Sequence, residues 1–163
     1  MSDLVTAPPV SDFEIAMEPP TGGEVAELLR ERDAYFSELY ADTQDRNARP
    51  VDLTQDALVF FTVRREGRLA GCGALVQGPD FGELKRFFLR PAYRGQGLGR
   101  RLVQAIEAEA RRRGCPRLML ETGVLQPDAI ALYRGQGFGE RGPFGSYTDD
   151  PLSVFMEKAL SAG

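Results

Sequence analysis

Apolar residues recur along the chain with the spacing of helices in three places. The strongest pattern lies between residues 98 and 113 and ends at Gly114, a residue that commonly stops a helix. Its apolar positions are Leu98, Leu102, Ala105, Ile106 and Ala110, which form one face. Further helices are predicted over residues 23–40, capped by Thr21, and over residues 126–136.

Shorter apolar runs predict strands. Residues 57–64 and 69–77 form a predicted hairpin around Glu66-Gly67. The other strands are expected at residues 13–17, 82–89, 117–121 and 152–157. This order of strands and helices predicts one mixed α/β domain, of the α+β kind and without repeats. We expect residues 1–11 to be a flexible leader, residues 12–163 to form the single domain, and residues 41–56 to form a long polar loop.

Composition narrows the function classes. The 163 residues are 42% apolar and 27% charged, which suits one globular core. The net charge of −4 does not favour binding to nucleic acid or to an anionic membrane. No apolar run is long enough for a membrane span, and the N-terminus lacks the pattern of a signal peptide. A cytoplasmic protein is expected.

The chain contains no histidine, and this excludes several catalytic designs. Ser-His-Asp and Cys-His catalysis and histidine-containing zinc sites are ruled out. The two cysteines, Cys72 and Cys115, lack metal-ligand spacing and are expected to be buried thiols, so no metal is predicted. Proton transfer must therefore use Glu, Asp, Tyr, Lys, Cys or water.

A glycine-rich turn joins a predicted strand to the strongest helix. The strand ends in Phe87-Phe88-Leu89, and Arg94-Gly95-Gln96-Gly97-Leu98-Gly99-Arg100 leads into the helix. The N–H groups at a helix start, together with its dipole, bind anions, and glycine lets the backbone approach them. The same region holds nine basic residues: Lys85, Arg86, Arg90, Arg94, Arg100, Arg101, Arg111, Arg112 and Arg113. The alternative is an exposed basic helix face without a ligand.

Two common phosphate-binding patterns do not fit this turn. A nucleoside triphosphate loop needs Lys-Ser or Lys-Thr after its last glycine, but Arg100-Arg101 follows here. A dinucleotide fingerprint needs a third glycine where Arg100 stands. The anion is therefore of another kind.

The turn resembles the Arg/Gln-x-x-Gly-x-Gly/Ala pyrophosphate loop of the GNAT superfamily of N-acetyltransferases. Downstream, Gln126-Pro127-Asp128-Ala129-Ile130-Ala131-Leu132-Tyr133-Arg134-Gly135-Gln136-Gly137-Phe138 resembles the family's Asn-x-x-Ala-x-x-Leu-Tyr-x-x-x-Gly-Phe segment. The resemblance covers roughly residues 57–158. It implies a mostly antiparallel central sheet with a splayed strand pair, flanked by helices. It also implies direct transfer of an acetyl group from acetyl-CoA to an amine within a ternary complex.

The resemblance assigns a set of residues to acetyl-CoA. Backbone groups of Phe87 and Leu89 would bind the pantetheine, and the amide of Phe88 or Leu89 would stabilise the oxyanion. The pyrophosphate would lie against the turn, and Gln126, in place of the family's Asn, would contact the cofactor more weakly. The residues of the turn are Arg94, Gly95, Gln96, Gly97, Leu98, Gly99 and Arg100.

Two residues are candidates for proton transfer. Tyr133 matches the tyrosine that protonates the departing CoA thiolate, although it would also suit the apolar core. Glu83 stands where histone-type members place a general base; it could instead pair with Lys85 or Arg86, or bind the amine. Glu121 and ordered water are alternative bases. Neither cysteine is placed for a covalent acyl intermediate.

The acceptor is the least defined part of the prediction. Pockets in this superfamily would draw here on residues 35–50 and 143–153. Tyr147, Asp149 and Asp150 are candidates to recognise a cation, but Asp-Asp-Pro is also an ordinary turn. We expect a small-molecule amine. The alternatives are a protein or peptide acceptor, a non-catalytic CoA sensor, and a phosphate-loop module without CoA. Homodimers are frequent in the superfamily, but no residue here indicates one.

Overall fold

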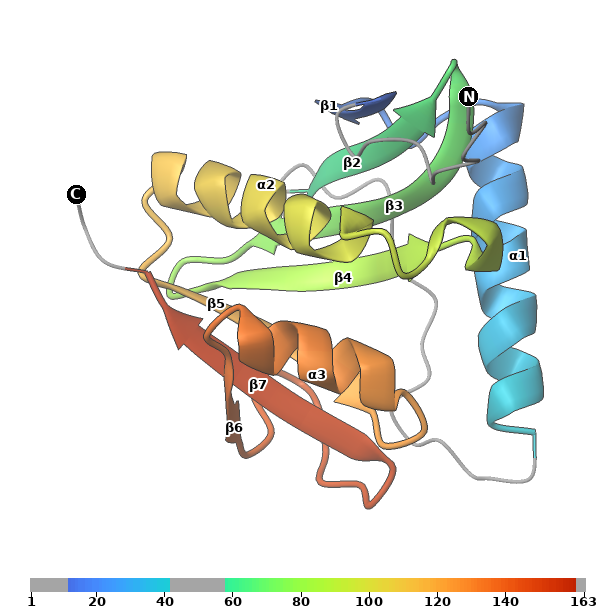
Figure 1. The fold of residues 1–163 in the computed structure, drawn as a ribbon. Helices are drawn as coiled ribbons and strands as arrows, with labels where there is room; N and C mark the ends of the chain where they lie inside the picture. The colour runs from blue at the N-terminus through green and yellow to red at the C-terminus, as the bar shows by residue number, and fades with distance from the viewer. Residues whose placement is uncertain (1–11, 42–57, 161–163) are drawn as a thin grey trace, which may run out of the picture.

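The computed structural model describes residues 12–41 and 58–160. The expected leader and almost all of the expected polar loop lie outside the described residues. In chain order the elements are β1 (Phe13–Met17), α1 (Gly23–Leu39), β2 (Leu58–Arg65), β3 (Arg68–Gln77), β4 (Gly82–Leu89), the 3-10 turn η2 (Pro91–Tyr93), α2 (Leu98–Arg112), β5 (Arg117–Gly123), α3 (Pro127–Gly135), β6 (Gly139–Arg141) and β7 (Ser153–Ala159) (Figure 1).

The strands form one seven-stranded sheet in the order β1-β2-β3-β4-β5-β7-β6. Neighbouring strands are antiparallel except β4 and β5, which are parallel. Helices α2 and α3 cover one face of this sheet (Figure 1), and α1 packs against the other face, over β3. The predicted class, a mixed and mostly antiparallel sheet flanked by helices, is confirmed.

Alternation along β3 explains why both faces of the sheet are covered. Ala70 and Leu75 belong to the core beneath α2, whereas Leu69, Cys72 and Ala74 pack with Val25 and Leu28 of α1. All of these side chains are almost fully buried. A strand buried on both faces has a nearly continuous apolar sequence, which is the pattern of residues 69–77.

The parallel strands β4 and β5 are hydrogen-bonded only at their beginnings. Their register pairs Gly82 with Leu118, Glu83 with Met119 and Leu84 with Leu120, and it ends there. On its other side β4 continues to pair with β3, but with an irregularity between Cys72 and Ala74. Beyond Leu84 the two strands therefore separate, which confirms the predicted splayed pair. Beyond Leu84, no strand among the described residues pairs with the edge of β4 that faces β5.

The structure differs from the predicted elements in small ways. Strand β6 and the turn η2 were not predicted, because three mostly exposed residues give no apolar alternation. Helix α1 begins after Gly22, whose φ of 95° disfavours other residues, so the prediction that Thr21 caps it is wrong. Strands β5 and β7 each continue about two residues beyond the predicted ends.

Candidate active site

The turn between β4 and α2 presents a row of backbone donors. Gly95 and Gly97 have φ of 76° and 81°, and Gly97 is the N-cap of α2 without a side-chain cap. The first bond of the helix runs from the N–H of Arg101 to the carbonyl of Gly97. Among the described residues, none accepts a hydrogen bond from the N–H groups of residues 95–100. The left-handed glycines thus leave these groups available to an external anion.

Gly99 has a different role from its neighbours. A Cβ at this position would lie 2.9 Å from Cδ2 of Leu132 in α3, whereas one at Gly95 would meet nothing within 4 Å. The absence of a side chain at Gly99 lets α2 approach α3. Because α3 carries Tyr133, this contact positions the tyrosine relative to the turn.

The side chain of Arg94 lies on the α1 side of the turn. Its Nε donates to the carbonyl of Leu89 at 2.8 Å, and Nη1 donates to the hydroxyl of Tyr35 at 3.1 Å. The guanidinium also stacks on the rings of Tyr35 and Phe88. Arg94 therefore joins the end of β4 to α1, while Arg100 is exposed at the start of α2.

Tyr133 is buried beside the opening between β4 and β5. Its ring makes edge-to-face contacts with Phe87 and Phe138, so it is part of the core as well as a candidate donor. Burial raises the pKa of its hydroxyl, the positive charge of Arg32 lowers this pKa, and the negative charge of Glu121 raises it. A hydroxyl with a raised pKa stays protonated at neutral pH, as a proton donor must.

Glu83 lies on the opposite face of β4 from the Tyr133 core. Its Oε2 accepts a hydrogen bond from the hydroxyl of Tyr147 at 2.5 Å, and Nζ of Lys85 lies 3.6 Å away. Burial raises the pKa of the Glu83 carboxyl, while the Tyr147 hydrogen bond and the Lys85 charge lower it. The sequence singled out Glu83 and Tyr147 separately, and the fold brings them together.

The other acidic candidates, Glu121, Asp149 and Asp150, differ in their surroundings. Oε2 of Glu121 accepts a hydrogen bond from the hydroxyl of Ser153 at 2.9 Å. Asp150 is 3% exposed, and its Oδ1 accepts from the N–H of Leu152, as expected of the turn interpretation. Asp149 is exposed.

Gln126 contacts a residue that the sequence did not single out. Its Nε2 lies 3.3 Å from the hydroxyl of Tyr40, at the end of α1, and the N–H of Leu125 lies at the same distance from it. A Cβ at Gly123 would fall 1.7 Å from this hydroxyl, so the glycine makes room for Tyr40. No pattern links Tyr40 to Gly123, because 83 positions separate them along the chain.

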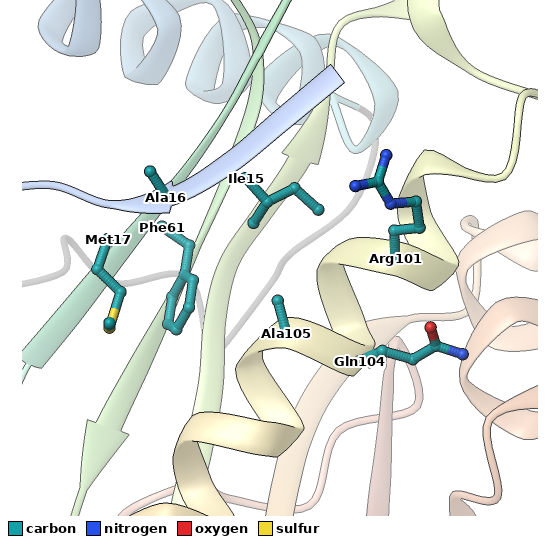
Figure 2. A pocket seen from close by; sticks show the side chains of 7 residues that line it. All are labelled: Ile15, Ala16, Met17, Phe61, Arg101, Gln104 and Ala105. Carbon is teal, nitrogen blue, oxygen red and sulfur yellow. The ribbon is translucent and has the colours of Figure 1, made fainter. Parts of the chain in front are cut away.

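The thiols and one surface cavity lie outside this arrangement. Cys72 is fully buried and donates to the carbonyl of Arg86; burial raises its pKa to about 12. Figure 2 shows the side chains that line a surface cavity between β1 and α2, and none of them was assigned to acetyl-CoA or to proton transfer. The cavity has a volume of about 480 Å³. Within residues 12–41 and 58–160, no group of three or more acidic, cysteine or histidine side chains is placed to hold a metal ion. No helix in the same ranges is long and apolar enough to span a membrane.

Comparison with known proteins identifies the family. Residues 25–138 match the model of the acetyltransferase (GNAT) family. The chain belongs to the GNAT family. The resemblance drawn from the two motifs is thereby confirmed, and the protein is an acyltransferase of the N-acetyltransferase type.

Relatives of similar length support this assignment. The IAA acetyltransferase of Azospirillum brasilense is 46% identical, over 90% of this chain and 97% of its own length. The uncharacterized N-acetyltransferase YsnE of Bacillus subtilis is 33% identical, over 91% and 100%. Among solved structures, a putative acyl-CoA N-acyltransferase of Klebsiella pneumoniae has a TM-score of 0.77 and 40% identity, covering 91% of this chain and 98% of that one.

Proposed function

We propose that this GNAT protein transfers an acetyl group from acetyl-CoA to the amine of a small molecule, by direct transfer in a ternary complex. The observation that carries the proposal is the row of N–H donors at residues 95–100, beside the place where β4 and β5 separate. Tyr133 and Glu83 flank this opening from the two faces of the sheet.

The turn and the strand fit coenzyme A. The diphosphate needs several donors and no obstructing side chains, and the two left-handed glycines meet both needs. The edge of β4 beyond Leu84 offers further backbone groups for an extended amide chain such as pantetheine. When bound, acetyl-CoA supplies an activated acyl group as a thioester.

Two side chains would move the protons of the transfer. As a bond forms between the amine nitrogen and the acyl carbon, the carboxylate of Glu83 would accept a proton from the nitrogen. As the carbon–sulfur bond breaks, Tyr133 would give its hydroxyl proton to the sulfur that leaves with the electron pair. Burial raises the pKa of both groups, and this suits the two roles. Tyr133 stays protonated and can act as the acid, and Glu83 becomes a stronger base.

Direct transfer is supported by the state of the cysteines. Cys72 is 0% exposed and Cys115 5%, and burial raises the pKa of both thiols. A thiol must reach the substrate as a thiolate to form an acyl intermediate, and neither meets this condition.

A small acceptor is supported by the confinement of Glu83. Its side chain is 13% exposed, and Tyr147 binds the carboxylate from the segment that precedes β7. Little of this carboxylate is therefore exposed to an approaching amine. A free amine of a small molecule reaches it more easily than a lysine on a folded protein.

The test is a screen of the full chain with acetyl-CoA, in which released thiol is measured against small amines and against peptides. We expect turnover with members of the small-amine panel. Tyr133→Phe should lower kcat by about a hundred-fold, since general acid catalysis contributes roughly 10²–10⁴-fold. Tyr93→Phe is the control, because its ring packs against Phe13, away from the opening. Turnover with peptides alone would reject the small acceptor, and equal kcat in the Tyr133 variant would remove that residue from the mechanism.

A further inference from the structure

Two arginines meet on the α1 side of β4, and the carboxylate that pairs with both of them balances only one of their two positive charges. Nη1 of Arg32, in α1, and Nη1 of Arg86, in β4, each lie 3.1 Å from Oδ1 of Asp33. One carboxylate thus serves two guanidinium groups. The side chain of Asp33 is 61% exposed, whereas those of Arg32 and Arg86 are 22% and 10% exposed.

Both arginines keep an unused donor inside the protein. The Nε atoms of Arg32 and Arg86 are buried and have no hydrogen-bond acceptor among the described residues. A buried donor without a partner is destabilising, and in native structures it calls for an explanation such as strain, a catalytic role, or a bound water, ion or ligand. Because a guanidinium presents its donors as a planar fork, the group that fits is a planar anion such as a carboxylate.

The backbone holds Arg86 in an unfavourable conformation to achieve this. Its φ is 54°, in the left-handed region that residues other than glycine seldom adopt. It stands where the pairing of β4 with β3 is irregular. The irregularity directs Arg86 to the α1 side, where it reaches Asp33, although its neighbour Phe87 packs against Tyr133 on the other side.

The arginine pair lies close to the proposed chemistry. The positive charge of Arg32 is near enough to the hydroxyl of Tyr133 to lower its pKa against the larger effect of burial. Glu83 stands three residues before Arg86 on the same strand, about 10 Å away along the backbone. The α1 side of β4 therefore carries the carboxylate of Glu83, which suits an amine, and further along the strand it carries the place where the guanidinium groups of Arg32 and Arg86 meet.

We propose that Arg32 and Arg86 bind the carboxylate of the acceptor, which is an amino acid or a similar amino-carboxylate. This rests on the proposed function, because it names the acceptor class of the same site. Asp33 occupies the place of the substrate carboxylate in the free protein. The acceptor carboxylate displaces it and also engages the unused Nε donors. The ammonium end then lies towards Glu83.

The experiment compares matched acceptors that differ only in the carboxylate. Full-length protein and acetyl-CoA are assayed with phenylalanine and phenylalaninamide, leucine and leucinamide, and 4-aminobutyrate and 4-aminobutanamide. Each kcat/KM is calculated with the concentration of unprotonated amine, so that the different pKa values of the amines do not affect the comparison. We expect the wild type to prefer the free acid by at least about ten-fold in kcat/KM, because hydrogen bonds to a charged group are stronger than those to a neutral amide.

Variants assign this preference to the arginines. Arg86→Met and Arg32→Met should bring the ratio of acid to amide close to one, mainly through KM, and Arg86→Lys should restore part of it. Asp33→Asn should lower KM for the acids. Arg90→Met is the matched control, because Arg90, directly after β4, also pairs with a carboxylate of α1, that of Glu31, but does not belong to the arginine pair. It should leave the ratio unchanged.

The outcomes separate the two proposals. Amides acetylated as well as acids by the wild type would overturn the carboxylate site and leave the acetyltransferase proposal intact, whatever the variants do. A preference for acids that survives Arg86→Met and Arg32→Met, in variants that still bind CoA and melt cooperatively, would also overturn it. If none of the amines causes release of thiol from acetyl-CoA, the proposed function is overturned, and this inference with it.

Discussion

The two halves of the candidate site are built in different ways. The half assigned to the acyl donor consists mainly of consecutive residues, from the end of β4 through the glycine turn into α2, with Gln126 and Tyr133 added from α3 and its start, and its chemistry is mostly that of the backbone. The half assigned to the acceptor joins side chains from distant segments, such as Tyr147 with Glu83 and Arg86 with Asp33. A site made of backbone groups suits a ligand shared by a whole family. A site made of side chains suits a ligand that differs between members.

The donor half is most sharply tested at Gly97. We expect Gly97→Asp to weaken CoA binding by about a thousand-fold. Two unit charges 4 Å apart at a protein surface interact by about 4 kcal/mol, which corresponds to that factor in Kd. Calorimetric titration with CoA measures the change.

Gly67→Asp is the control for this substitution. Gly67 has a φ of 80°, nearly the same as that of Gly97, but it lies in the β2–β3 turn. Both variants therefore carry the same backbone strain and the same new charge. Equal CoA affinity in the two variants would place the diphosphate elsewhere.

The acceptor half is tested by the pH dependence of Tyr147→Phe. The hydroxyl of Tyr147 lowers the pKa of Glu83, and burial alone raises it. Without the hydroxyl the pKa of Glu83 rises further, so a base that must be ionised becomes active only at higher pH. The acidic limb of kcat/KM should shift to higher pH, with the loss confined to the acidic side of the profile and little change on its plateau, since one pKa unit alters the ionised fraction about ten-fold on the acidic side.

Glu83→Gln is the comparison for this profile. It removes the titrating group, so this limb should disappear together with most of the activity. If the limb of Tyr147→Phe coincides with that of the wild type, Glu83 is not the base, and Glu121, which is bonded to Ser153, becomes the next candidate.

The same division explains what the sequence could predict. The turn at Gly95 and Gly97 and its position before an amphipathic helix depend on local conformation, which composition and spacing reveal. The splayed pair followed only from the resemblance to a family. The sequence did not single out Arg32 or Tyr40, although Tyr40 lies in the range 35–50 expected at the acceptor pocket. Each is one polar residue in or next to a mainly polar helix, and its contacts appear only when α1 lies against the sheet.

The three glycines of the turn look equivalent in the sequence. The substitution Gly99→Ala tests whether Gly99 serves the packing of α2 against α3, unlike the other two. A Cβ at Gly99 would lie 2.9 Å from Cδ2 of Leu132, so we expect crowding against α3 that costs about 1 kcal/mol or more. Replacing a helical glycine by alanine normally stabilises the protein by up to about 1 kcal/mol, so in Gly99→Ala the two effects nearly cancel.

Gly135→Ala in α3 is the control, because the new Cβ meets nothing within 4 Å and should show the gain alone. Denaturant unfolding should therefore place Gly135→Ala above Gly99→Ala in stability, with CoA affinity changed less than about three-fold in both. A large loss of CoA affinity in Gly99→Ala would instead show that a Cβ at Gly99, like one at Gly97, obstructs the bound diphosphate.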